Sequence, residues 1–141
     1  MARKKYKGMD NNIIRFSFNW NGKLNNRAFT TIRIHNPNKY TIGKTYQIEL
    51  NGKPNGKATL QDKRVLRVDQ LNRFICYLDT GYSQTETMNI LKRMYKTIDL
   101  QTALFDFCLL VYTTPNKQEI KDLQATLELW YYGNIHRNNT K

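Results

Sequence analysis

An almost uninterrupted run of apolar residues restricts the fold of this chain more than any other feature. The run is ALFDFCLLVY, residues 103–112, and Asp106 is its one charged residue. A strand with apolar side chains on both faces must be covered on both, because neither face can be left against water. The run therefore predicts a central strand with other elements packed on either side of the sheet.

The part of the chain before this strand begins with the two-residue period of strands. Alternating or β-branched segments occupy residues 13–18, 29–34, 45–50 and 57–68. Asn-Gly dipeptides, which tolerate positive φ, stand after two of these segments, at 21–22 and 51–52. We expect turns there, the second of them joining an antiparallel pair of strands.

The segment 29–34 divides its side chains between two faces. Thr30, Ile32 and Ile34 share the face that we expect to pack on the core. Thr31 and Arg33 then lie side by side on the other face. An arginine inside an apolar strand needs a partner, which would be either a buried carboxylate or a phosphate of a ligand.

Helical spacing replaces the strand period after residue 68. Asp69 is the expected cap of a first helix that stops at Gly81, with a buried stripe of Leu71, Phe74, Ile75 and Leu78. Ser83 and Glu86 form a capping box for a second helix, with a buried stripe of Met88, Leu91, Met94 and Tyr95. A third helix is expected after Pro115, with one stripe formed by Ile120, Leu123, Leu127 and Trp130.

These elements predict one mixed α+β domain, with a strongly bent mixed sheet or small barrel and two helices packed beside it. The expected divisions are a basic flexible arm at 1–12, the domain at 13–113, an added C-terminal helix at 114–134 and a polar tail at 135–141. No stretch has the length and apolar character of a membrane span or a secretory signal. We therefore expect a cytoplasmic protein.

The net charge of +12 lies entirely in the first half of the chain. Residues 1–67 carry fifteen basic and three acidic residues, and the remainder carries eight of each. A positive electrostatic field confined to one segment favours a polyanion as the partner, and nucleic acid is the polyanion that we expect first. The alternative is a compositional drift towards Lys, Asn, Ile and Tyr, as occurs in phage and bacterial proteins from AT-rich genomes.

The residue types of catalytic and metal sites are poorly represented. His35 and His136 stand apart from any cysteine or carboxylate cluster, and no glycine-rich phosphate loop is present, so no metal site and no cofactor are expected. Cys76 and Cys108 lie inside apolar runs and are expected to be buried core residues in a reducing compartment. The composition favours a binding module over an enzyme.

Basic and aromatic side chains alternate along the first strands, as they do in proteins that grip single-stranded nucleic acid. RNA or single-stranded nucleic acid is thus the expected partner, and a free nucleotide is the alternative ligand. The candidate binding residues are Arg27, Thr31, Arg33, His35, Lys39, Lys44, Lys53 and Lys57.

Residues 29–33 (FTTIR) and 40–48 (YTIGKTYQI) resemble the ASCH domain family of the PUA-like superfamily, in which a Thr-x-Arg strand precedes a glycine and a further strand. The later order of a strand, two helices joined by a capped turn and an apolar strand is also similar. The likeness covers about residues 13–113. It implies a PUA-like pseudo-β-barrel with a cleft beside the Thr-x-Arg strand, in a superfamily known for RNA binding and for reading modified bases.

Some bacterial members of that family hydrolyse acetylated cytidine with a threonine, a lysine and a glutamate. By the resemblance the threonine falls on Thr31, and the lysine position falls on Ala28, beside Arg27. The glutamate falls near Thr80, where Asp79 is the closest carboxylate. Thr31 and Asp79 are therefore the only weak catalytic candidates, and the resemblance implies binding more than hydrolysis.

Two alternatives to a binding module stay open. One is an enzyme that acts on a nucleoside, with Asp79 or another acid in place of the glutamate. The other is a phage or host-takeover interaction protein that docks a protein partner on the C-terminal helix, whose end carries Trp130, Tyr131 and Tyr132. We expect this aromatic end to pack on the core if it is not such an anchor.

Overall fold

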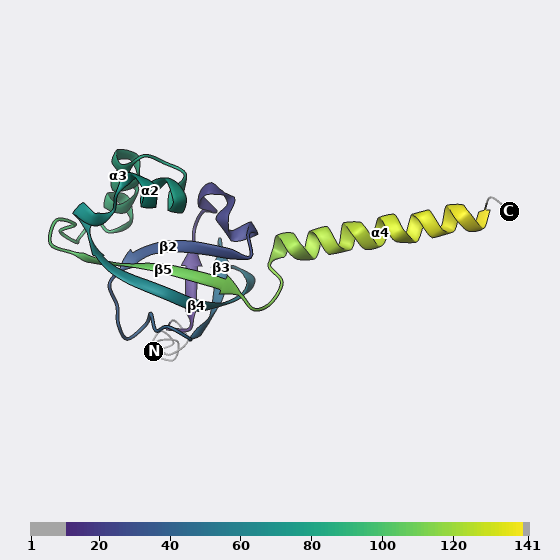
Figure 1. Cartoon of the computed structure of the whole chain (residues 1–141), viewed down its shortest axis with the longest axis horizontal. Helices are drawn as coiled ribbons and strands as arrows, with labels where there is room; N and C mark the ends of the chain where they lie inside the picture. The colour runs from purple at the N-terminus through teal and green to yellow at the C-terminus, as the bar shows by residue number, and fades with distance from the viewer. Residues whose placement is uncertain (1–10, 140–141) are drawn as a thin grey trace.

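Five strands form one curled sheet in the order β1-β3-β4-β5-β2, which closes about half of a barrel (Figure 1). The computed structural model describes residues 11–139, with side chains described to residue 134. Most of the expected arm (1–10) and the last two residues lie outside the described range. The strands are β1 Ile13–Phe16, β2 Ala28–Ile34, β3 Thr45–Leu50, β4 Lys53–Arg67 and β5 Leu104–Tyr112.

The long strand β4 bends the sheet. It pairs antiparallel with β3 near its start and with β5 along most of its length, and the register with β5 shifts between Leu60 and Asp62. A bulge of this kind increases the local twist and curls the sheet. The sheet is mixed, because β1 pairs with β3 in parallel while all other neighbours are antiparallel. The expected bent mixed sheet is therefore present.

Strand β5 lies between β4 and β2, as the apolar run predicts. Its two faces contribute to two different clusters: Cys108 and Leu110 pack inside the half-barrel, and Phe105 packs against the helices. Leu104 and Leu109 are more than a third exposed, so burial on both faces does not extend over the whole strand.

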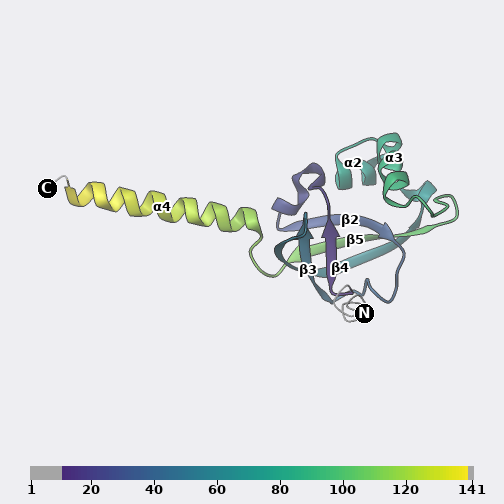
Figure 2. The ribbon, with the colours of Figure 1, turned by 180° about the vertical axis from the view of Figure 1, so that it is seen from behind.

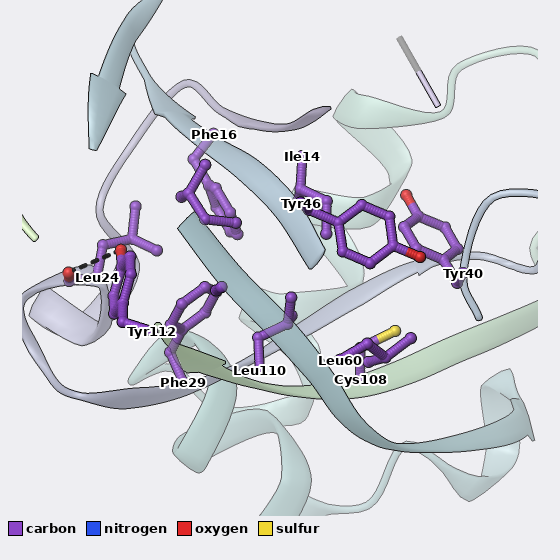
Figure 3. Packing of buried hydrophobic residues seen from close by; sticks show 12 residues of the cluster. Ile14, Phe16, Leu24, Phe29, Tyr40, Tyr46, Leu60, Cys108, Leu110 and Tyr112 are labelled. Atoms are coloured by element: carbon purple, nitrogen blue, oxygen red, sulfur yellow. Dashed lines mark hydrogen bonds between the residues drawn. The ribbon is translucent and has the colours of Figure 1, made fainter. Parts of the chain in front are cut away.

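The cluster inside the half-barrel holds more buried residues than the cluster under the helices. Figure 3 shows aromatic side chains from β1, β2, β3 and β5 meeting there, and Leu60 of β4 lies beside Cys108 in the same cluster. The two rings of Phe16 and Phe29 meet edge to face, with 5.9 Å between their centroids. Burial raises the pKa of the Cys108 thiol to about 12, which fits the expected role of this residue as part of the core.

Two short helices cover one face of the sheet (Figures 1 and 2). They are α2 Arg73–Thr80 and α3 Gln84–Met94, and a 3₁₀ turn, η3 Val68–Gln70, precedes them. Gly81 adopts the expected left-handed conformation after α2, and Ser83 and Glu86 form the expected capping box. The cap of α2 is Asn72 and not Asp69, because the chain first makes the 3₁₀ turn.

The buried face of α2 differs from the predicted stripe. Cys76, Asp79 and Thr80 point inward, whereas Phe74 and Leu78 are 73% and 52% exposed. The helical periodicity of the sequence predicts burial of the apolar side chains instead. Hydrogen bonds to the Asp79 carboxylate from other elements rotate the helix to a different face, and an eight-residue helix is too short to bury both faces.

The helical cluster also covers β2, so both faces of this strand are packed. Ile32 lies in the cluster under the helices as expected, but Phe29 and Thr31 on the other face are buried as well. In α3 the buried residues are Thr87, Ile90 and Leu91, and Met94 of the expected stripe is half exposed.

The last helix, α4 Lys117–Asn139, projects away from the sheet and the other helices (Figures 1 and 2). Asn116 caps it by accepting a hydrogen bond from the backbone N–H of Glu119 at 2.8 Å. The helix continues five residues past its expected end at 134, because Gly133 does not take the left-handed conformation that stops a helix. Among the helices described, none is long and apolar enough to cross a bilayer.

A substitution at Gly56 in β4 tests how closely the connection between β5 and α4 packs on the sheet. Its φ is +111°, and an added Cβ would lie 3.1 Å from the Pro115 carbonyl oxygen and 3.2 Å from the Tyr112 ring. We expect Gly56→Ala to lower the free energy of unfolding by about 1–3 kcal/mol, measured by chemical denaturation. Gly43→Ala is the control, since Gly43 has a φ of +90° with open space around it. Equal losses for the two variants would contradict the packing argument.

Candidate functional site

A pocket of about 230 Å³ opens between the two edge strands of the half-barrel and the helices. β1 and β2 form one side of it, and α2, α3 and the 3₁₀ turn η2 Trp20–Asn25 form the other. Its polar lining includes Lys23, Asp79, Thr31 and Arg33. Thr31 and Arg33, predicted to lie beside a cleft, both line this pocket.

A buried ion pair between Lys23 and Asp79 lines the pocket. Their side chains are 6% and 5% exposed, and the Lys23 Nζ lies 3.0 Å from the Asp79 Oδ1. The same carboxylate oxygen accepts a hydrogen bond from the Thr30 hydroxyl at 2.8 Å. One carboxylate therefore joins η2, β2 and α2.

The turn at Asn21 and Gly22 brings Lys23 into the pocket. Both residues have positive φ, near +60°, so the chain kinks within η2. The two side chains that follow the kink, Lys23 and Leu24, are buried. The Asn-Gly dipeptide is thus a turn as expected, although it does not form a β-hairpin.

Burial lowers the pKa of Lys23 below its usual 10.5, and the charge of Arg33 lowers it further. The attraction and hydrogen bond of Asp79 raise the pKa but do not offset the cost of removing the ammonium from water. Lys23 consequently has a neutral amine at a lower pH than an exposed lysine does. A neutral amine beside a carboxylate can accept a proton or a hydrogen bond from a ligand.

Arg33 lies at the seam between the two edge strands. Its Nη2 donates to the Arg15 carbonyl oxygen at 2.7 Å, and its Nε donates to the Thr31 hydroxyl oxygen at 2.9 Å. The guanidinium also lies over the Phe16 ring, 4.5 Å from its centroid. No acidic side chain among the described residues forms an ion pair with Arg33.

An aromatic group forms part of the rim. Trp20 lines the pocket and meets the rings of Phe18 and Tyr82 edge to face, at centroid distances of 4.7 and 5.9 Å. The Arg15 side chain, which pairs with Glu49 at 3.3 Å, lines the pocket as well. The pocket therefore combines hydrogen-bonding groups, flat apolar surfaces and cationic side chains.

Two other predicted binding residues have partners within the protein. Arg27 pairs with Glu119 of α4 at 2.6 Å, close to the start of that helix. The ring of His35 contacts the buried Asp106 carboxylate at 2.8 Å, and the same carboxylate accepts the Asn36 N–H. Neither residue lines the pocket.

The four predicted lysines are distributed over other parts of the sheet. The Nζ atoms of Lys39 and Lys44 lie over the rings of Tyr40 and Tyr46, at 5.7 and 5.2 Å from the centroids. Lys53 and Lys57 are exposed residues of β4. None of the four candidate binding lysines lines the pocket, so these cations do not gather around it.

Sequence reasoning missed Lys23 and Trp20. The resemblance places a lysine at the position of Ala28, three residues before Thr31, whereas the lysine that lines the pocket is Lys23 of η2, eight residues before Thr31. The local signal was the Asn-Gly turn directly before Lys23, although a turn does not show which side chain becomes buried. Asp79, the closest carboxylate to the expected glutamate position, does lie in the pocket.

Comparison with models of known protein families and with curated proteins finds no match to this chain. Over the residues that the structure describes, no group of three or more His, Cys, Asp or Glu side chains is placed to hold a metal ion.

A double-mutant cycle tests whether Lys23 and Asp79 depend on one another. We expect Lys23→Met to lower the free energy of unfolding by about 3–5 kcal/mol, because it leaves the Asp79 charge buried without its partner. Asp79→Leu should have a similar effect. The double variant should lose less than the sum of the two, since it buries no isolated charge. Additive losses, measured by denaturant unfolding, would show that the two groups do not interact.

Proposed function

We propose that the protein is a binding module that holds a nucleobase of single-stranded RNA in the pocket beside Thr31 and Arg33. The observation that carries this proposal is the pocket itself, in which a Lys23–Asp79 pair, a guanidinium and an aromatic rim face one small hollow. Nucleobases offer hydrogen-bond donors and acceptors on their edges and flat faces for stacking. These are the groups that the lining of the pocket complements.

The charge of the chain supports a nucleic acid over a neutral ligand. Arg15 and Arg33 line the pocket, where the sugar-phosphate backbone of a bound nucleotide would pass. The remaining cations of the first half give the surface a positive field that attracts a polyanion. Lys39, Lys44, Lys53 and Lys57 contribute to this field in the proposal and do not form the pocket.

The curled sheet and the position of the pocket are consistent with a PUA-like pseudo-barrel of the ASCH type. The pocket lies beside the Thr-x-Arg strand, where the resemblance implies a cleft. The two helices with their capped turn follow the strands in the expected order. We propose this family assignment on that likeness of order and site.

Trp20 offers a direct readout of binding. The chain has two tryptophans, and Trp130 lies on α4, so Trp130→Phe leaves Trp20 as the only one. In this background we expect short single-stranded RNA to change the Trp20 fluorescence in a saturable way. Arg33→Gln should weaken binding about tenfold or more, because a charge-assisted hydrogen bond is lost. It should also make the slope of log K against log salt about 0.7 less steep.

Arg67→Gln is the matched control. It removes one positive charge from an exposed side chain that pairs with Asp69 and lies outside the pocket. We expect at most a twofold loss of affinity. Equal losses for the two variants would point to diffuse surface binding, and a lack of any RNA binding at low salt would overturn the proposal. Thermal unfolding of each variant checks that the fold is retained.

Hydrolysis of an acylated nucleoside is a second candidate function, favoured by one specific observation. Lys23, with its lowered pKa, shares the pocket with Asp79 and Thr31, so all three chemical groups of the family's hydrolases occur there. The Thr31 hydroxyl accepts a hydrogen bond from Arg33 and keeps its own proton for donation. A neutral Lys23 amine can accept a proton from a hydroxyl or a water that attacks an acyl carbon.

A panel of N-acyl and O-acyl nucleosides tests this candidate. If the protein is a hydrolase, Lys23→Met and Thr31→Val should each abolish release of the acyl group, and Lys53→Met should not change the rate. The rate should rise with pH as Lys23 loses its proton and level off below pH 10.5, because the pKa of Lys23 is lowered. Wild-type rates in Lys23→Met, or no product from any substrate, would exclude this function.

A further inference from the structure

Helix α4 exposes a stripe of large apolar side chains to water. Its start contacts η2, and beyond that the helix projects away from the sheet and from α2 and α3 (Figure 1). The stripe consists of Ile120, Leu123, Leu127 and Trp130, which are 44–69% exposed. The expectation that the aromatic end packs on the core is therefore wrong. A helix with no packed face is marginal in water by itself, so the stripe needs a partner.

The spacing of the stripe is that of a helix pair. Steps of three, four and three residues separate its four members, which are the a and d positions of a heptad. The charged residues between Ile120 and Trp130 are Lys121, Asp122 and Glu128, and all of them lie on the opposite side of the helix. Next to the stripe stand the uncharged Gln124 and Thr126. The stripe thus has no flanking charges that would favour pairing with a different chain over pairing with a second copy.

We propose that the stripe binds the same stripe of a second copy of this chain, with the two helices antiparallel. A twofold axis at the level of Ala125 places Ile120 against Trp130 of the other copy and Leu123 against Leu127. Each contact then occurs twice, as symmetry requires of such an interface. Every member of the stripe finds an apolar partner in this register, and the large Trp130 ring faces the smaller Ile120.

Electrostatic repulsion selects the antiparallel arrangement. Helix α4 carries three basic and three acidic residues, so the whole net charge of +12 belongs to the rest of the chain. Parallel helices would bring two strongly positive bodies together at one end. Antiparallel helices separate them by the overlapping residues 117–133, about 25 Å at 1.5 Å per residue. That separation is more than twice the distance over which salt screens exposed charges.

The interface between the two helices is short, so we expect the affinity of the dimer to be modest. Four apolar positions per helix make less contact than a standard interface of about 800 Å² per partner. We therefore expect a dimer that dissociates in roughly the micromolar range. Because a lone α4 is marginal, the far-ultraviolet helical signal should fall together with the dimer on dilution.

Sedimentation velocity of the full chain across a hundredfold concentration range tests the proposal. We expect a monomer–dimer equilibrium. Leu123→Lys/Leu127→Lys and Leu123→Glu/Leu127→Glu should each be monomeric at every concentration, and an equimolar mixture of the two should form a heterodimer. A wild-type chain that is monomeric throughout, or oligomers that survive both charged variants, would overturn the proposal.

Further variants test which element α4 binds in the second copy and whether the two helices are antiparallel. Phe74→Lys alters the exposed face of α2 and should leave the dimer unchanged. If this variant were monomeric, α4 would dock on α2 of the other copy. A mixture of Ile120→Cys and Trp130→Cys should form a disulfide between the two variants. Ile120→Cys alone should not, because its two copies lie about 15 Å apart along antiparallel helices. A disulfide in Ile120→Cys alone would show parallel helices and overturn the register.

Discussion

The Asp79 carboxylate is the interaction on which the site depends. One of its oxygens accepts hydrogen bonds from Lys23 of η2 and Thr30 of β2, and the carboxylate itself comes from α2. Two neighbouring elements, η2 and β2, are therefore held against α2, a helix far along the chain, around one buried charge. The same contact turns α2 so that its polar face points inward and Phe74 faces water. Since a buried carboxylate is costly without partners, the arrangement is favourable only when all three elements are in place.

Positive charge and pocket chemistry are separate properties of this molecule. The electrostatic field of the N-terminal half arises from many lysines and arginines, and most of those that the structure describes contact other groups of the protein. The pocket uses few cations, and two of these are held in place by contacts inside the protein: Lys23 by Asp79, and Arg33 by Arg15 and Thr31. A distributed field attracts a polyanion from a distance, whereas the fixed groups of a pocket determine which part of it is bound.

The half-barrel and helix α4 are held in place by different interactions. The half-barrel is a packed core in which aromatic rings from four strands meet (Figure 3). Helix α4 has a polar cap at Asn116 and an ion pair between Arg27 and Glu119, but almost no apolar contact with the body. Its apolar stripe is thus left available for association. The pocket and the stripe lie on different parts of the molecule, so binding in one need not obstruct the other.

The sequence by itself determined the features that depend on neighbouring residues. The period of side chains predicted the strands and their order with the helices, and Gly81 and the Ser83 capping box marked helix ends, because these signals act within one or two turns. Only the tertiary structure decided which polar groups share a pocket. Lys23 lies in the pocket and Asp79 turns inward in place of Phe74, because contacts between distant segments outweigh the local preference for burying apolar side chains.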